Sequence, residues 1–349
     1  MRIAKSPAAI VAALVMFAST FLVALTASPA SAATHRFTSI TANIGSGADN
    51  DLNDNGTFDG WGTNENPLVE LTAQINANQP DVVFIQEACE RDYAKMQQKF
   101  PGYYFGQFVW QQQGSRPDLG AVPPYTQNSC EKTNGQQTVE QKGTFIMSAW
   151  PIVDQSVQVL PVIPVAGTAD ATFQTRKSRR HTLAGAQILW GAGGGKGIVN
   201  VFNTHLPAGD EDADDISSRT MATTAVANTV NAYDAGGKVV LGGDFNSSPK
   251  TYNIDLLHRV KRDGSGAASG LFWETGMKQN IDGTACKSAF DNVCRDGEKT
   301  LRKSGRKSDY IFYGKTYVKA KLSVGATSNR SETSAHNVLV GTVDLIDFK

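Results

Sequence analysis

The sequence predicts an α/β (α+β) protein in which two packed β-sheets carry helices on their outer sides. Short apolar runs typical of strands recur along the chain, whereas only two segments have a helical pattern. Polar residues stand where many of the strand-like runs begin or end. A regular βαβ alternation would place a helix between successive strands, so the small number of helices favours two sheets packed on each other.

Each strand is predicted from apolar alternation or from a short buried run. Residues 35–44 alternate and then break at Gly45, and the run DVVFI at 81–85 follows a helical segment at 68–76. A second helix, rich in alanine, is predicted at 217–230. The remaining predicted strands are 144–147, 182–189, 197–202, 238–241, 309–313 and 338–343.

The N-terminal segment has the three parts of a secretory signal peptide. Arg2 and Lys5 precede an apolar run from residue 8 to residue 25, and Ala30-Ser31-Ala32 forms a small-residue cleavage site. An uncleaved membrane anchor is the alternative, because signal peptides usually have an apolar region of only ~7–15 residues. No basic stop-transfer cluster follows the run. We therefore expect residues 1–32 to be removed and residues 33–349 to form one secreted, monomeric domain without stable membrane insertion.

The charge balance restricts how the protein can bind a polyanion. The chain has 33 Lys and Arg residues and 33 Asp and Glu residues, for a formal net charge of zero. A neutral surface does not attract phosphate as a whole, which excludes a histone-like binder. An enzyme with a locally basic cleft remains compatible with this composition.

The four cysteines are Cys89, Cys130, Cys286 and Cys294. An even number in an exported chain favours two disulfides, and the spacing favours Cys286–Cys294 and Cys89–Cys130. Zinc binding is the alternative. It is disfavoured because the sequence has no C-x-x-C pair and no histidine at ligand spacing near these cysteines.

The segment Gly242-Gly243-Asp244-Phe245-Asn246 ends an apolar strand and is the first candidate for chemistry. Alternation puts Asp244 and Asn246 on the same face of the strand, and the glycines let another backbone or a ligand approach closely. A carboxylate and an amide two residues apart can hold a water and a phosphate oxygen together. An Asx-turn that ends the strand is the structural alternative.

Three further polar residues follow apolar strands: His205 in VFNTHL, Glu87 in FIQE and Asn43 in TANI. An unpaired buried carboxylate is unfavourable by several kcal/mol, so Glu87 needs a cation or a metal. A lone histidine after a strand is more often structural, and a strand-end asparagine is often only hydrogen-bonded. These residues become stronger candidates for a functional site because they occur together with Asp244.

Seven segments in order along residues 36–348 resemble the endonuclease/exonuclease/phosphatase superfamily: TANIG, VVFIQEAC, GTFIMSAWPI, VFNTHL, VVLGGDFNSSP, SDYIF and SAHNVLVGTV. This group of deoxyribonuclease-like enzymes includes bacterial sphingomyelinases, inositol-polyphosphate phosphatases and toxin subunits that cut DNA. The resemblance implies a four-layer sandwich of two facing, mostly antiparallel sheets with helices outside. It also implies a metal-dependent hydrolase.

The resemblance assigns the metal and the attacking water to four residues. Glu87 would ligate Mg²⁺ (or Mn²⁺), with Asn43 binding or orienting beside it; oxygen ligands and retained waters suit this ion. Asp244 would orient or deprotonate the water, and Asn246 would hold the transition state.

Phosphate recognition would fall to histidines and an arginine. By resemblance, His205 and His336 would bind the non-bridging oxygens or shuttle protons, and Asp309 would fix the tautomer of His336. A carboxylate partner raises the pKa of a histidine and so favours its charged form. Arg180 is our candidate for a phosphate clamp, and Arg179 is its near-equal rival.

One position departs from the family pattern. Members commonly end with Ser-Asp-His, whereas this chain reads Ser334-Ala335-His336. The loss of this carboxylate implies a weaker single metal site, compensation by another acid such as Glu332, or an impaired enzyme.

Three other features can be interpreted either as ordinary structure or as functional sites. Residues 51–59 place oxygen side chains at the spacing of a calcium-binding turn, without the usual final glutamate; the alternative is a solvated loop. The basic run at 299–307 leads into Asp309 and either contacts substrate or is only solvated. Phe272 and Trp273 are expected in the core rather than in a membrane-binding hairpin.

The expected function is hydrolysis of phosphodiester bonds by a secreted, divalent-metal-dependent endonuclease that acts on extracellular DNA. A sphingomyelinase-like or inositol-phosphate-type phosphoesterase would use the same residues. A non-catalytic polyanion-binding protein of the same fold is the alternative outside the enzyme class, because Ala335 permits the loss of turnover.

Overall fold

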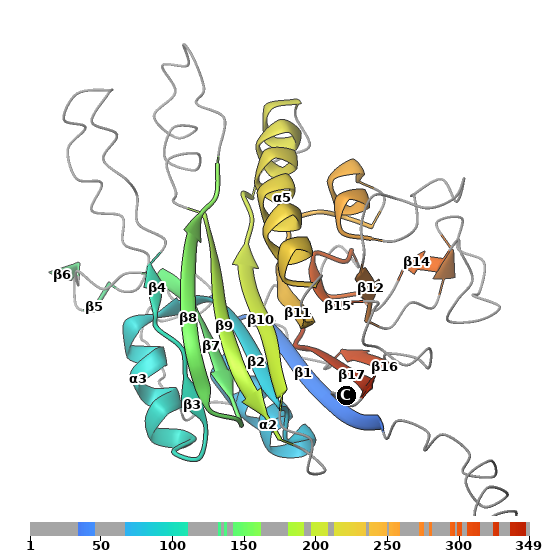
Figure 1. Ribbon diagram of the computed structural model, residues 1–349. Helices are drawn as coiled ribbons and strands as arrows, with labels where there is room; N and C mark the ends of the chain where they lie inside the picture. Colours follow the sequence, from blue (N-terminus) through green and yellow to red (C-terminus); the bar gives the residue numbers. More distant parts are fainter. Residues whose placement is uncertain are drawn as a thin grey trace, which may run out of the picture.

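The structure is a computed structural model, drawn in Figure 1. It describes residues 34–45, 67–110, 132–133, 136–137, 142–161, 181–191, 197–208, 213–234, 237–249, 251–258, 272–275, 279–280, 294–296, 299–301, 306–314, 324–327 and 336–346. The predictions for the signal peptide (1–32), the candidate calcium loop (51–59), Arg179, Arg180 and Ala335 fall on positions outside these ranges.

Two large sheets form the centre of the protein. The first contains, in spatial order, β16 (Val324–Thr327), β17 (Leu339–Ile346), β1 (Thr34–Asn43), β2 (Val82–Cys89), β7 (Lys142–Ser148) and β3 (Tyr104–Phe105), with β4 (Val109–Trp110) also paired to β7. The second contains β12 (Phe272–Glu274), β15 (Asp309–Gly314), β11 (Lys238–Asp244), β10 (Gly197–His205), β9 (Thr182–Trp190) and β8 (Ile152–Val159). Two short pairs stand apart, β5 (Lys132–Thr133) with β6 (Gln136–Gln137) and β13 (Gln279–Asn280) with β14 (Cys294–Asp296).

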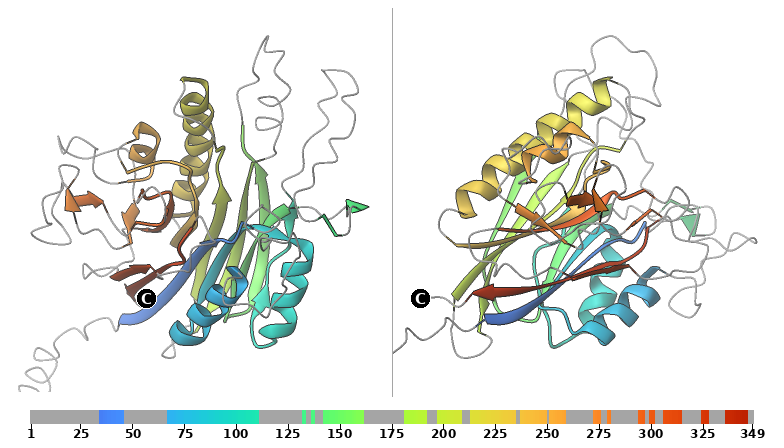
Figure 2. Two further views of the ribbon diagram at one scale, coloured as in Figure 1. Left: turned by 180° about the vertical axis from the view of Figure 1, so that it is seen from behind. Right: turned by 90° about the vertical axis from the view of Figure 1, so that its right-hand side faces the viewer.

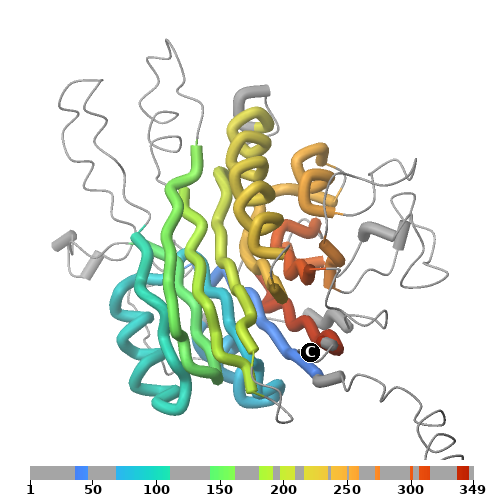
Figure 3. Tube along the Cα trace, viewed as in Figure 1, coloured from blue at the N-terminus to red at the C-terminus, as the bar shows by residue number. Residues whose placement is uncertain are grey.

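Most neighbouring strands are antiparallel. The parallel neighbours in the described sheets are β1 with β2 and β10 with β11. The tube in Figure 3 follows the chain from β1 through the first sheet, across the second sheet and α5, and back to β17 beside β1. The two sheets are therefore mixed but mainly antiparallel, as predicted.

Helices cover the outer face of each sheet, which gives four layers (Figure 2). The helices α2 (Pro67–Asn78) and α3 (Glu90–Lys99) lie outside the first sheet, where Leu71 and Met96 join its apolar side chains in one core. On the second sheet, Val226 of α5 (Ala213–Asp234) packs in another core, beside the 3₁₀ helix η5 (Tyr252–Leu256). A third core fills the space between the sheets. The predicted four-layer sandwich is confirmed.

The space between the sheets changes from apolar to polar along the strands. Phe84, Val201 and Val240 point inward and are fully buried. Two residues further along their strands, Gln86 and Asn203 face each other and form a hydrogen bond of 2.7 Å between Gln86 Nε2 and Asn203 Oδ1. The next inward positions carry the predicted site residues, so strand alternation itself directs those side chains to one end of the sandwich.

Two glycines let the sheets approach each other and let β10 lie close to β11. A Cβ on Gly242 would lie 2.1 Å from Cδ2 of Phe84 in the facing sheet. Gly243 has φ of 151°, and a Cβ there would lie 2.1 Å from the carbonyl oxygen of Thr204. Both glycines of the GGDFN segment therefore have a packing reason, as the close-approach interpretation expected.

The structure contains elements that the sequence patterns did not predict. Helix α3 is mostly polar and buries little beyond Asp92 and Met96; it begins where the Asp92 carboxylate accepts a 2.8 Å hydrogen bond from the Cys89 backbone. Strand β8 is an exposed edge strand, so it shows no buried run. In contrast, Phe272 is fully buried, which confirms the core interpretation for this residue, whereas Trp273 is only partly buried.

None of the described helices is long and apolar enough to cross a bilayer. No free cysteine occurs in the described part of the chain. Because Cys130 and Cys286 lie outside it, the disulfide pairing remains a prediction.

Candidate active site

The described members of the predicted site all lie at one end of the sandwich. Asn43 and Glu87 come from the first sheet, and His205, Asp244 and Asp309 come from the second. His336 lies three residues before β17, and Asn246 lies two residues after β11. Residues from six strand ends therefore meet at one place, whereas Arg180 lies outside the described ranges.

A bulge in the first sheet turns Glu87 toward this site. The pairing of β2 with β7 shifts register between Ile85 and Ala88. Glu87 sits in the shift with φ of 53°, a left-handed conformation that is uncommon for a residue with a side chain. Gln86 already points inward, so regular alternation would turn Glu87 outward. The bulge instead brings consecutive side chains to the inner side.

A buried amide from the second sheet stabilises the bulge. Asn203 Nδ2 donates 2.9 Å hydrogen bonds to the carbonyl oxygens of Ile85 and Phe145, which flank the shifted segment. Its Oδ1 accepts from Gln86, whose Nε2 also donates to Thr41 Oγ1 at 3.1 Å. These groups are all buried, so their pairing avoids a large desolvation cost. Asn203 thus links the two sheets directly below Glu87.

Asn43 faces the acids with its amide nitrogen. Its Nδ2 donates to Asp244 Oδ2 at 2.9 Å and to Glu87 Oε1 at 3.3 Å. The orientation is fixed by Gly45, because the backbone N–H of Gly45 can only donate and lies 3.0 Å from Asn43 Oδ1. In this arrangement Asn43 orients the two carboxylates.

Lys142, at the first position of β7, joins the site although the sequence patterns did not indicate it. Its Nζ lies 2.8 Å from Glu87 Oε2, and its side chain is 13% exposed. Lys142 pairs in register with Cys89, beyond the bulge. Its position directly before GTFIM, a segment that resembles the family, was the signal available in the sequence.

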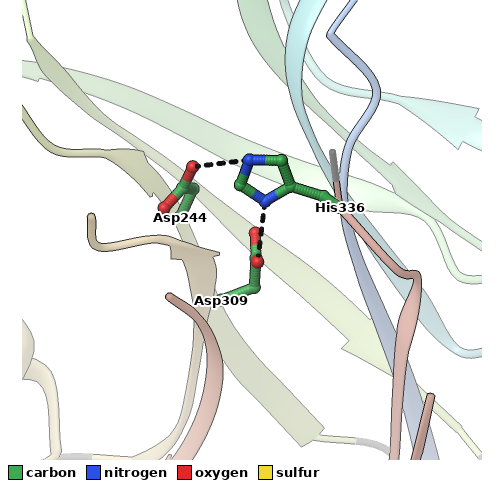
Figure 4. Close-up of side chains that lie close together, drawn as sticks. All are labelled: Asp244, Asp309 and His336. Carbon is green, nitrogen blue, oxygen red and sulfur yellow. Dashed lines mark hydrogen bonds and ion pairs between the residues drawn. The ribbon is translucent and has the colours of Figure 1, made fainter. Parts of the chain in front are cut away.

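His336 is held by a network around Asp309. Its Nδ1 lies 2.9 Å from Asp309 Oδ2, and its Nε2 lies 3.9 Å from Asp244 Oδ2 (Figure 4). The same Asp309 oxygen accepts from Ser308 Oγ at 2.9 Å, and the Asp309 backbone N–H donates to Thr300 Oγ1 at 3.0 Å. Because Nδ1 is engaged by the carboxylate, Nε2 is the nitrogen that faces Asp244 and the site.

His205 and Asn246 complete the group around Asp244. His205 Nε2 lies 3.7 Å from both Glu87 Oε1 and Asp244 Oδ2. The backbone N–H of Asn246 donates to Asp244 Oδ1 at 2.8 Å, and its side chain donates to the Leu206 carbonyl at 2.9 Å. Asn246 has φ of 47°. The turn that follows β11 therefore fixes one oxygen of Asp244 from the backbone side.

The charges of the site shift the pKa values of its members. Burial opposes ionisation of Glu87, but the charges of Lys142 and His205 outweigh it and hold the Glu87 pKa well below its usual range. Burial and the neighbouring Asp309 carboxylate raise the pKa of Asp244. For Asp309, burial is outweighed by the charge and hydrogen bond of His336, which lower its pKa.

The pKa of His336 is raised well above that of an ordinary histidine. Burial alone would lower it, but the Asp309 carboxylate and its hydrogen bond raise the pKa to about 9. His336 is therefore charged at neutral pH, and its Nε2–H is a donor that faces the site. A charged donor of this kind suits a phosphate oxygen.

The donor chemistry fits a hard divalent cation such as Mg²⁺. The Glu87 carboxylate is 21% exposed, and the amide of Asn43 bridges it to Asp244, so carboxylate oxygens of the kind that such an ion prefers lie close together. Asp244, Asp309 and His336 also have ligand atoms within 4.8 Å of one another. The carboxylates of that second group are almost fully buried, so the more exposed Glu87 is the better ligand.

The basic run before Asp309 divides between surface and interior. Lys299 and Arg306 are exposed. Lys307 is buried, 2.5 Å from Glu274 Oε1, and its Nζ lies 5.0 Å from the ring centre of Tyr310. The expectation of a solvated or substrate-contacting run is therefore wrong for Lys307, because an acid on β12 neutralises it inside the protein.

The fold and the clustered acids and histidines are those of a phosphoesterase scaffold. The sequence model of the Endonuclease/Exonuclease/phosphatase family matches residues 40–331, and the chain belongs to this family. The family consists in general of hydrolytic phosphoesterases that act on nucleic acids or other phosphoesters. No curated protein matches the chain.

Several solved structures share the fold at low sequence identity. The catalytic domain of human Nocturnin with bound sulfate is 13% identical over 89% of this chain and 94% of its own, with a TM-score of 0.53. A family protein from Bacteroides thetaiotaomicron is 13% identical over 90% of this chain and 97% of its own, with a TM-score of 0.51. One from Beutenbergia cavernae is 18% identical over 89% and 72%, with a TM-score of 0.50.

Proposed function

We propose that this protein is a secreted, divalent-metal-dependent phosphodiesterase that cleaves DNA outside the cell. The observation that carries the proposal is the group formed by Asp244, Glu87 and the His336–Asp309 pair at one end of the sandwich. It combines a candidate base, a carboxylate for a metal and a charged donor for phosphate, and Asn43 and His205 connect the two carboxylates.

Asp244 would accept the proton of the attacking water. Its Oδ1 is held by the Asn246 backbone and its Oδ2 by the Asn43 amide, so the carboxylate has one orientation. Its raised pKa, caused by burial and by Asp309, brings it closer to the pH at which general bases work best. Asn43 and Asn246 therefore act as positioning residues for this step.

His336 would hold a non-bridging phosphate oxygen. Its charge is maintained by Asp309, and its Nε2–H points to the side of Asp244 where the reacting phosphate would lie. His205, which faces Glu87 and Asp244, is placed to donate to a second oxygen. A divalent cation, when bound at Glu87, supplies further neutralisation of the negative charge that develops on the phosphate.

The surface beside Asp309 favours a polyanionic substrate. Lys299 precedes Thr300, which binds the Asp309 backbone, and Arg306 lies two residues before Ser308, which binds the Asp309 carboxylate. Both cations are exposed. A substrate with several phosphates would use them, whereas a small phosphoester would not reach beyond the reacting group. This observation favours nucleic acid over a phosphoester with a single phosphate, such as the head group of sphingomyelin.

A substrate panel tests the proposal directly. Purified protein would be incubated with plasmid DNA, RNA, sphingomyelin vesicles and inositol phosphates, each with Mg²⁺ and with chelator. We expect chelator-sensitive nicking of DNA. Choline phosphate release from the vesicles would support the phospholipid alternative, and polyanion binding without any turnover would support the non-catalytic one.

A matched pair of variants connects the activity to the site. Asp244→Asn keeps the shape of the side chain and should lower the rate by about 10²-fold or more, the usual size of a general-base contribution. Asp154→Asn changes an exposed carboxylate on the outer edge strand and should leave the rate unchanged. An unimpaired Asp244→Asn enzyme with the wild-type melting temperature would exclude the mechanism.

Export is a separate part of the proposal. It is supported by the charged start, apolar run and Ala30-Ser31-Ala32 site. The N-terminus of protein recovered from outside the cell should be Ala33. Recovery of the chain only with cell membranes, with Met1 retained, would favour the anchor instead.

A further inference from the structure

Lys142 gives the site a positive charge of its own. The Lys142 ammonium contacts Oε2 of Glu87 while the Asn43 amide contacts Oε1, so both oxygens of the carboxylate have a partner. A divalent cation at Glu87 would meet the ammonium at the same carboxylate. The two positive charges would then lie close together and repel each other.

The position of Lys142 is built into the sheet. It lies in register with Cys89, immediately after the bulge that turns Glu87 inward. The adjacent Gly143 is closed in, because a Cβ there would lie 2.5 Å from the Phe108 ring and 2.6 Å from the Val109 carbonyl oxygen. The ammonium is therefore held beside Glu87 by two paired strands, and its side chain is only 13% exposed.

The sequence departure at residue 335 points in the same direction. The aspartate that the family pattern has at this position would add a negative charge, and this chain has alanine. Among the described site residues, the acids are Glu87, Asp244 and Asp309, and Lys142 and His336 face them as cations. One acidic group fewer and a lysine in contact with Glu87 both reduce the negative potential that attracts a divalent cation.

We propose that Lys142 is an internal cation that competes with the divalent metal for Glu87, so that the protein binds metal weakly and only when the ammonium is displaced. The inference rests on the proposed function only in taking Glu87 as the metal ligand. It assigns a regulatory role to Lys142: the lysine sets the metal concentration that the site needs.

Direct metal binding tests the inference without any turnover. The full chain would be titrated with Mn²⁺, and free Mn²⁺ would be followed by its electron paramagnetic resonance signal. Lys142→Met removes the charge but keeps an unbranched side chain, and it should tighten Mn²⁺ binding at least about tenfold, since a partly buried charge pair is stronger than an exposed one. Lys142→Arg keeps the charge and should not tighten it.

Two controls separate competition at Glu87 from a general charge effect. Lys99→Met removes an exposed lysine at the end of α3 and should leave the affinity unchanged. In a Glu87→Gln background, Lys142→Met should have no effect, because the shared carboxylate is gone. Lys142→Gln serves as the second charge-free variant if the methionine variant does not fold.

The outcomes are distinct from those of the substrate panel. Unchanged or weaker Mn²⁺ binding by a folded, charge-free Lys142 variant overturns the inference, whatever the protein hydrolyses. Equal tightening by Lys99→Met, or tightening that persists with Glu87→Gln, overturns it as well. Tightening specific to Lys142 sustains it even if no tested phosphoester is cleaved, in which case only the proposed function fails.

Discussion

Replacing Asn203 with leucine should destabilise the protein far more than a typical asparagine substitution. The change keeps the approximate size of the side chain but removes its donors from the carbonyl oxygens of Ile85 and Phe145 and its acceptor from Gln86. Each buried carbonyl left without a partner costs about 1–3 kcal/mol, so we expect a loss of about 3–5 kcal/mol in the free energy of unfolding. The cost arises beside the bulge, where the register between β2 and β7 shifts after Ile85.

Urea unfolding followed by circular dichroism measures this loss. Asn200→Leu is the matched control, because Asn200 lies on the same strand but makes longer bonds, with Gln187 at 3.1 Å and the Lys238 carbonyl at 3.4 Å. We expect the control to lose about 1 kcal/mol or less. A loss below about 1 kcal/mol for Asn203→Leu, with an unchanged denaturant slope, would refute the assigned role of Asn203 in holding the bulge.

Three further predictions concern the site and its substrate. Gly243→Ala should lower the free energy of unfolding by about 1–3 kcal/mol. The new Cβ would meet the Thr204 carbonyl oxygen at 2.1 Å, and the backbone has φ of 151°. A melting temperature equal to that of the wild type would contradict this prediction. The pKa of His336 is about 9 in the folded protein, which is above the pKa of an unfolded histidine. Pairing with Asp309 therefore stabilises the metal-free protein fully below about pH 6.5. This stabilisation is lost as the pH rises through about 9. The stability difference between wild type and His336→Gln should therefore shrink by about 3 kcal/mol over this interval in urea titrations with chelator, and a constant difference would count against the charged pair. DNA cleavage should weaken steeply with salt, and rates that do not change between low and physiological salt would exclude a role for the exposed cations in DNA binding.

The sequence predicted the elements whose apolar periodicity reaches the core. Strands such as β11 and β15 are buried along their whole length, so their apolar runs are unambiguous. The exposed edge strand β8 and the polar helix α3 lack such runs. They form because the sheet supplies a pairing partner in one case, and because Asp92 caps the first turn in the other.

The site was predictable where strand alternation alone places a side chain. Asp244 follows this rule, and the structure brings it against Asn43 and His336 as the predicted grouping requires. Glu87 faces the same place only because a bulge interrupts the alternation of β2. No local sequence pattern predicts this bulge. Lys142 was missed because its role depends on the register between two strands that are more than fifty residues apart in the chain.

The Lys307–Glu274 pair shows a residue that the sequence pattern predicted to be exposed and that the structure buries. A run of basic residues is usually solvated, and the sequence alone offers no reason to bury one of them. The acid that neutralises Lys307 lies on β12, and His258 is also 3.5 Å from it. A charge partner that is distant in the sequence thus determines which lysine of the run is buried.

The pairing of β17 with β1 has a consequence for when the protein can act. Thr34, at the start of the first described strand, pairs with Ile346, near the end of the chain, and His336 reaches Asp244 just before that last strand begins. The proposed phosphate donor is therefore in place only after strands that are far apart in the sequence have paired. A chain in which β17 has not yet paired with β1 lacks a complete site, so folding itself delays hydrolytic competence until this pairing has formed.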